Sequence, residues 1–219
     1  MRKLSDDAGA PKTLRALRFL AIRLRGRPEA EEVRGLVEGA RTQLRAAYEQ
    51  WLQAREERVA ASQQLRYEDE RLDEAMADLA RRALVLVGGD RTDARYRRLF
   101  RQPPSEAMAP RASEAQAAFV RGVLQAIEEE EAFAELREAA SRLGERLAAV
   151  EAALAARRER ADAEVQARGR LEQALEEGRR AYNLAHPRLT LLFPDAPRLV
   201  ESFFLPAPEQ LAAMEEAEA

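Results

Sequence analysis

The sequence predicts an all-α fold, an elongated antiparallel helical bundle or coiled-coil hairpin with shorter flanking helices. Its 219 residues are 46% hydrophobic but only 5% aromatic, because Ala and Leu supply most of the apolar side chains. Such a composition, rich in Ala, Glu, Leu and Arg, is typical of long helices. In two long segments apolar residues recur at alternating spacings of four and three, and no run alternates with a period of two.

The clearer of these segments predicts a long helix over residues 131–185. Its apolar stripe becomes polar at Arg157 and Glu164 and apolar again from Val165. Pro187 disfavours the helical conformation of the residue before it, so we expect the helix to end at Leu184. The first half of the stripe consists of Leu136, Ala140, Leu143, Leu147, Val150 and Leu154.

The other segment predicts a long helix over residues 28–87. Pro28 suits a first helical turn, and Gly88-Gly89 is a strong stop signal. A hairpin that pairs Val87 with Glu131 aligns the two helices end to end and places the polar middle of each seam, residues 55–69 and 149–163, side by side. The apolar seam runs through Val33, Val37, Leu44, Trp51, Leu65, Leu72, Met76, Leu79 and Leu86.

Three shorter regions complete the expected bundle. Residues 1–27 form a basic N-terminal segment with a short helix near 13–25, and residues 88–112 form a connector with a short helix from Asp93 to Phe100. Residues 113–129 form a helix capped by Ser113. The four glutamates at 128–131 repel one another, so we expect a break near 129–132 and a helix that folds back over residues 65–86.

The C-terminal segment, residues 187–205, carries nine large apolar side chains within 17 residues. We expect Asp195 to cap a short helix with Pro197 in its first turn. This segment either packs on its own bundle near Tyr48 and Trp51 or covers a second copy or a partner, since open apolar patches mark interaction sites. Residues 206–219 read as a mobile acidic tail. The candidate interface residues are Leu192, Phe193, Leu199, Val200, Phe203 and Phe204.

Clusters of arginine suggest an alternative function, the binding of nucleic acid or of an anionic membrane surface. Of 36 basic residues only Lys3 and Lys12 are lysine, a bias typical of GC-rich genomes, so arginine clusters are discounted as binding sites. Arginine interleaved with aromatic residues can nevertheless bind nucleic acid, and a basic amphipathic helix can bind an anionic membrane surface. Segments 1–27 and 91–111 have these features. The candidate anion-binding residues are Arg15, Arg18, Arg25, Arg95, Arg98 and Arg101.

The sequence lacks the residue patterns that usually form metal sites, phosphate-binding loops and catalytic nucleophiles. The chain has no cysteine, and His186 is its one histidine, so we expect no metal site. Neither a glycine-rich phosphate loop nor a nucleophile elbow is present, and we expect no cofactor, no catalytic residue and no small-molecule substrate. These features predict that the protein is not an enzyme.

The sequence therefore favours a non-enzymatic interaction or scaffold protein whose partner is another protein or a second copy of this chain. Binding of nucleic acid or an anionic membrane surface is the alternative. Apolar runs such as residues 19–22 and 83–87 are far shorter than the roughly 20 residues that span a membrane. Arginines interrupt what would be the apolar core of a signal peptide, so we expect a cytoplasmic protein.

Overall fold

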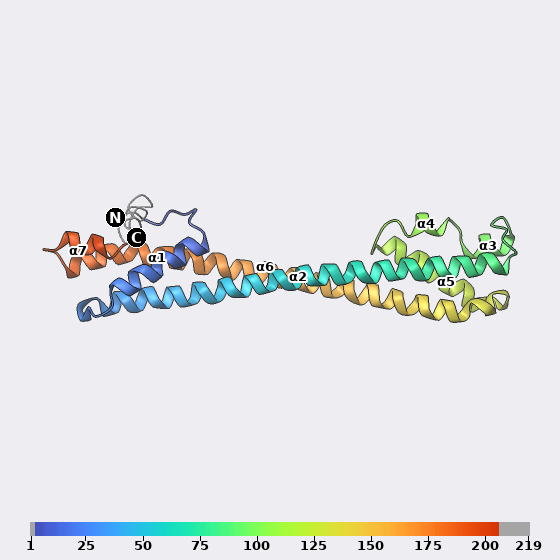
Figure 1. Cartoon of the computed structure of the whole chain (residues 1–219), viewed down its shortest axis with the longest axis horizontal. Coiled ribbons are helices and arrows are strands. Elements are labelled where there is room, and N and C mark those ends of the chain that lie inside the picture. Colours follow the sequence, from blue (N-terminus) through green and yellow to red (C-terminus); the bar gives the residue numbers. More distant parts are fainter. Residues whose placement is uncertain (1–2, 206–219) are drawn as a thin grey trace, which may run out of the picture. The chain divides into compact units, whose positions relative to one another are not determined.

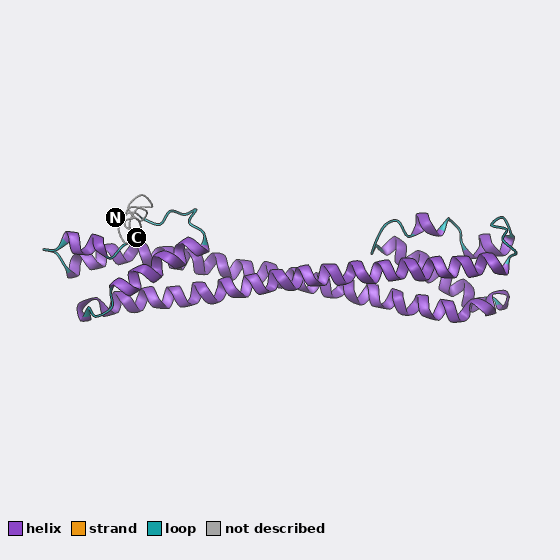
Figure 2. Cartoon of the chain, in the orientation of Figure 1, coloured by secondary structure: helices purple, strands orange, loops and turns teal. Residues whose placement is uncertain are grey.

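The computed structural model describes residues 3–205, and every regular element within that range is a helix, which confirms the all-α hairpin (Figures 1 and 2). The chain divides into two compact units. Unit 1 comprises Met1–Ala54 and Ala163–Ala219, and unit 2 comprises Arg55–Asp162. The expected acidic tail at 206–219 lies outside the described residues. The helices are α1 (Ala10–Arg23), α2 (Glu31–Leu86), α3 (Ala94–Leu99), α4 (Pro104–Ala107), α5 (Glu114–Glu129), α6 (Arg137–Leu192) and α7 (Pro197–Ser202).

The long helices α2 and α6 are antiparallel in each unit, in a register close to the predicted one. Pairing Val87 with Glu131 would place Glu57 opposite residue 161, and in unit 2 Glu57 accepts a hydrogen bond from Arg160 at 2.9 Å. The same pairing would place Glu32 opposite residue 186, and in unit 1 Glu32 accepts from Arg188 at 3.3 Å. Both pairs lie within two residues of the expected register.

Unit 1 is built by α1 and α7 packing on the ends of α2 and α6. Leu17 and Leu20 of α1 are fully buried together with Leu44 of α2, and Leu14 packs partly against them. Close packing depends on Gly178 of α6, because a Cβ there would lie 3.3 Å from side-chain carbons of Leu44 and Thr13. The apolar face of α1 is therefore part of this core.

Unit 2 has its own core, in which α5 is a separate helix that covers α2. Glu130 adopts an extended conformation (φ −113°, ψ 119°) and ends α5, as predicted from the glutamate run. Val120, Val123 and Ile127 of α5 are buried in one cluster with Met76 of α2. The fold-back of residues 113–129 is confirmed. Residues 131–136, expected to begin the second long helix, form a 3-10 helix that precedes α6.

Two details at the C-terminal end were predicted wrongly. α6 continues through Pro187 to Leu192 instead of ending at Leu184. An internal proline costs roughly 3 kcal/mol, but continuing the helix buries Leu189 completely in the core of unit 1. Asp195 does not cap α7, whose N-cap is Ala196 with no side-chain hydrogen bond. Pro197 does occupy the first turn, as expected.

None of the helices formed by residues 3–205 combines the length and the apolar character that crossing a bilayer requires.

Candidate functional site

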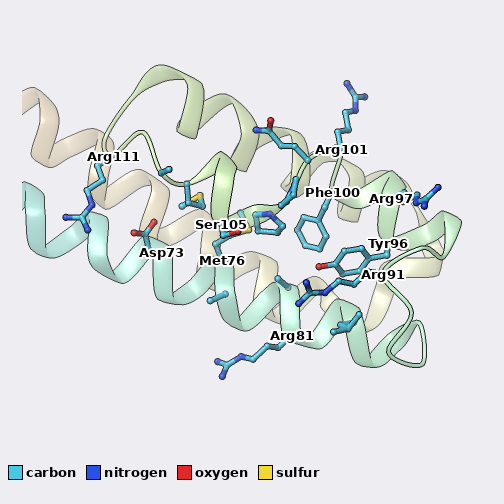
Figure 3. Close-up of a pocket in the computed structure, with 18 residues that line it drawn as sticks. Asp73, Met76, Arg81, Arg91, Tyr96, Arg97, Phe100, Arg101, Ser105 and Arg111 are labelled. Carbon is cyan, nitrogen blue, oxygen red and sulfur yellow. The ribbon is translucent and has the colours of Figure 1, made fainter.

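A pocket of about 860 Å³ lies in unit 2 (Figure 3). It lies where the connector between α2 and α5 crosses α2. Its floor is apolar: α2 contributes Met76, Ala80 and Leu84, and the connector contributes Phe100 and Met108. Pockets of this size and lining are typical of ligand sites.

The rim of this pocket is strongly basic. Five arginines line it, and Asp73 is the one acidic residue among the lining residues. Four of the arginines come from the connector, while Arg81 comes from α2 and forms an ion pair with Asp78 at 3.4 Å. Within residues 3–205 no carboxylate lies within ion-pair distance of the other four. These four arginines are Arg91, Arg97, Arg101 and Arg111.

The start of the connector is fixed by a sharp helix stop and two local caps. Gly88 and Gly89 have positive φ, and their amides donate back to Val85 and Leu84 at the end of α2, at 3.0 and 2.8 Å. The Asp90 carboxylate then accepts from the Thr92 amide at 2.7 Å. Next, Asp93 caps α3 by accepting from the Arg95 amide at 2.7 Å. The chain direction set here places Arg91 beside the pocket.

An aromatic pair forms one wall. The rings of Tyr96 and Phe100 lie 5.0 Å apart with an interplanar angle of 57°, a tilted contact typical of aromatic pairs. Phe100 is buried, while Tyr96 is half-buried. Figure 3 shows both rings facing the hollow, with Arg91 extended along Tyr96.

A buried polar cluster holds the other end of the connector to α2. Asp69 is only 2% exposed, and its Oδ1 accepts from the Ala112 amide and from Nε2 of Gln116, both at 3.0 Å. Ala112 has a φ of 46°, in the left-handed region that non-glycine residues rarely adopt. The hydrogen bond to Asp69 holds the chain in this conformation, which places Arg111 and Asp73 at the same end of the pocket (Figure 3).

The groups around Asp73 change the pKa of its carboxyl. Burial raises the pKa of its carboxyl, and the nearby negative charge of Asp69 raises the pKa further. The positive charge of Arg111 and a hydrogen bond from Gln116 act in the opposite direction, but the net pKa is raised. Ionised Asp73 is thus less favourable in the folded protein than in water.

Replacing Asp73 with asparagine is therefore expected to raise the free energy of unfolding at pH 7. A raised pKa in the folded state means that ionising Asp73 opposes folding, and asparagine removes this cost. At pH 3.5, below its ordinary pKa of 3.8, the carboxyl of wild-type Asp73 is mostly protonated in both states, so most of the gain should disappear there. Urea unfolding at pH 7 and pH 3.5 measures the difference.

Asp78→Asn is the control with the opposite sign. A hydrogen bond from Arg82 lowers the pKa of Asp78, so its ionised form stabilises the fold above pH 3.8. Asp78→Asn should lower the free energy of unfolding at pH 7. An Asp73→Asn gain that is the same at both pH values would contradict the role given to ionisation.

The three connector arginines that the sequence predicted as anion-binding have different environments in the structure. Arg101 lines the pocket rim. In contrast, Arg95 pairs with Asp93 at 3.1 Å and Arg98 pairs with Glu130 at 2.6 Å, so both are already neutralised. The predicted segment 91–111 contains the site, but the sequence did not show which arginines stay unpaired or that α2 supplies an apolar floor.

The N-terminal candidates Arg15, Arg18 and Arg25 are exposed on unit 1. Other arginines of this region bind within the unit. Arg23 donates to the carbonyl of Ser202 at 3.1 Å, and Arg27 lies over the ring of Phe203, 5.8 Å from its centroid. The helix that carries Arg15 and Arg18 has its leucines in the core.

The C-terminal interface candidates lie largely inside unit 1. Val200, Phe203 and Phe204 are buried in its core, and Phe193 and Leu199 pack partly against that core. Leu192, by contrast, is 43% exposed. The segment thus packs on its own unit, one of the two outcomes considered from the sequence.

Residues 3–205 contain no cluster of three or more His, Cys, Asp or Glu side chains that could hold a metal ion. Comparison with known protein families, with curated proteins and with solved structures finds no match for this chain.

Proposed function

We propose that this protein is a non-enzymatic interaction or scaffold protein, and that the pocket of unit 2 binds an acidic segment of a protein partner. The observation that supports this most is the composition of the lining: five arginines and one carboxylate around an apolar floor. Arginine is enriched at protein interfaces and pairs well with carboxylates. Apolar side chains of the same segment would contact Met76, Leu84 and Phe100.

The four unpaired rim arginines are exposed, so a ligand can reach them without breaking an ion pair. Elsewhere in unit 2, arginines such as Arg66 and Arg121 are paired with glutamates at 3.1 and 3.0 Å. Carboxylates arriving at the pocket would therefore form ion pairs that no carboxylate among residues 3–205 forms with these four arginines. Their gain per pair is modest and salt-dependent, because the arginines are exposed.

Nucleic acid or an anionic membrane is the competing ligand class, through segments 1–27 and 91–111. A phosphate backbone needs a continuous track of free cations, whereas residues 55–162 carry 19 arginines against 22 acidic residues. Membrane binding by α1 would have to release Leu17 and Leu20 from the core of unit 1. Both features favour a protein ligand over these alternatives.

Titration with fluorescent peptides tests the proposal. We expect binding of a peptide that combines glutamates with leucines, and none of the matching lysine–leucine peptide. Replacing Arg91 and Arg111 with glutamine should weaken binding at least tenfold, about 1.4 kcal/mol. Asp73→Asn should strengthen it, because the repelling carboxylate of the lining is removed.

The matched control replaces Arg66 and Arg168 with glutamine, since both are exposed arginines outside the pocket. It removes the same charge and should leave binding unchanged. Random duplex DNA and anionic vesicles are titrated in parallel over a range of salt concentrations. If DNA or vesicles bind more tightly than every acidic peptide, with a steep loss in salt, the alternative function replaces the proposed one.

A further inference from the structure

The chain itself contains a segment whose chemistry matches the pocket of unit 2. Residues 206–219 carry Glu209, Glu215, Glu216 and Glu218 and no basic residue. They also contain Leu211 and Met214, which lie between the first glutamate and the others. We infer that residues 206–219 of a second copy bind in this pocket. The inference rests on the proposed function and names its ligand.

The order of charged and apolar residues in the segment matches the order of arginines and apolar residues along the pocket. In Figure 3, Arg91 and Arg111 lie at different ends of the pocket, with Met76 between them and Phe100 at the end of Arg91. In the segment, glutamates lie on both sides of Leu211 and Met214. Carboxylates can thus reach both ends of the rim while the two apolar side chains contact the floor. An arginine that pairs with a carboxylate makes directed, charge-assisted hydrogen bonds.

The described chain leads into this segment from a fixed point on unit 1. Phe203 and Phe204 are buried, and the Leu205 amide donates to the Tyr182 hydroxyl at 3.4 Å. The ligand segment therefore begins directly after a buried anchor. Each copy carries both the segment and the pocket, so the contact between two copies joins two different surfaces. Contacts of this kind build either closed rings or open chains of copies.

Two full-length variants separate the two halves of this interface. The segment variant changes Glu209, Glu215, Glu216 and Glu218 to glutamine, and the pocket variant changes Arg91 and Arg111 to glutamine. Sedimentation velocity at low salt should show that wild type associates, and that each variant alone associates at least tenfold more weakly. An equimolar mixture should associate again, because one variant keeps its pocket and the other its segment.

Two controls test whether a general change in net charge or a loss of folding could explain weaker association. A variant with glutamine at the exposed Glu29, Glu56, Glu128 and Glu159 has the same net charge as the segment variant and should associate like wild type. Circular dichroism melting should be unchanged in the segment and pocket variants. A labelled peptide of residues 206–219 should bind the segment variant and be displaced by unlabelled peptide.

The outcomes distinguish this inference from the proposed function. If wild type remains monomeric and the 206–219 peptide does not bind, while other acidic peptides do, the inference is overturned and the proposed function stands. If no acidic peptide binds, both fall. If wild type associates but the mixture of variants does not recover association, the contact between copies lies elsewhere and the inference is overturned.

Discussion

Changing both Phe203 and Phe204 to alanine is expected to unfold unit 1 or to lower its melting temperature strongly. Both side chains are buried, at 2% and 4% exposure. The ring of Phe204 meets that of Tyr182 edge to face, with centroids 5.4 Å apart, and Phe203 lies 6.0 Å from Phe193. A buried Phe→Ala change costs about 3–5 kcal/mol. Two such changes approach the roughly 5–15 kcal/mol that stabilises a typical domain.

The fluorescence of Trp51, the one tryptophan of the chain, reports on unit 1 during thermal melting. The matched control changes Leu191 and Leu192 to alanine, since these residues of the same segment are 82% and 43% exposed. It should shift the melting temperature only slightly. If the phenylalanine variant melts like wild type but loses association, these residues act as an interface between chains and not as core.

Periodicity in the sequence was enough to predict the helices and their pairing. The stripe positions Leu44, Leu72 and Leu143 are fully buried, because spacing of three and four places them on one helix face. Strong local signals also fixed the ends: Ser113 caps α5 by accepting from the Gln116 amide at 3.1 Å, as expected. Long periodic segments with such caps leave few alternative arrangements.

Local signals failed where packing between distant segments decided the outcome. Pro187 predicts a helix end, but burial of Ala185 and Leu189 in unit 1 keeps α6 helical beyond it. Asp195 has the chemistry of a cap, yet α7 begins two residues later at Pro197. The largest helix-propensity penalty, that of proline, is about 3 kcal/mol, less than a well-packed face provides.

The pocket could be predicted only in part. The sequence shows six arginines and two aromatic residues in segment 91–111. Which of these arginines are free depends on contacts that are distant in sequence, such as Arg98 with Glu130. The floor residue Met76 and the polar anchor at Asp69 belong to α2 and show only a helical period. No local pattern connects them with the connector.

Asp69→Ala should destabilise unit 2 by about 1–3 kcal/mol for each of the two hydrogen-bond donors that it leaves without an acceptor. Asp69 is buried and accepts hydrogen bonds from the Ala112 amide and the Gln116 side chain. Gln116 is only 1% exposed, so its amide would lose this partner without gaining full access to water. The strained backbone at Ala112 would also lose the bond that holds it.

Asp69→Asn is the matched control, because its side-chain oxygen can still accept both bonds; its cost should be clearly smaller. Combining Asp69→Leu with Gln116→Leu should cost less than the sum of the single changes, since the bond between these two side chains is then lost only once and only the Ala112 amide is left without its acceptor. Urea unfolding followed by circular dichroism measures all five variants, the two single leucine changes included. Because the anchor positions Arg111, Asp69→Ala should also weaken the binding of acidic peptides at temperatures where the chain is still folded. An Asp69→Ala protein as stable as Asp69→Asn, with unchanged peptide binding, would show that the connector is held by its apolar contacts alone.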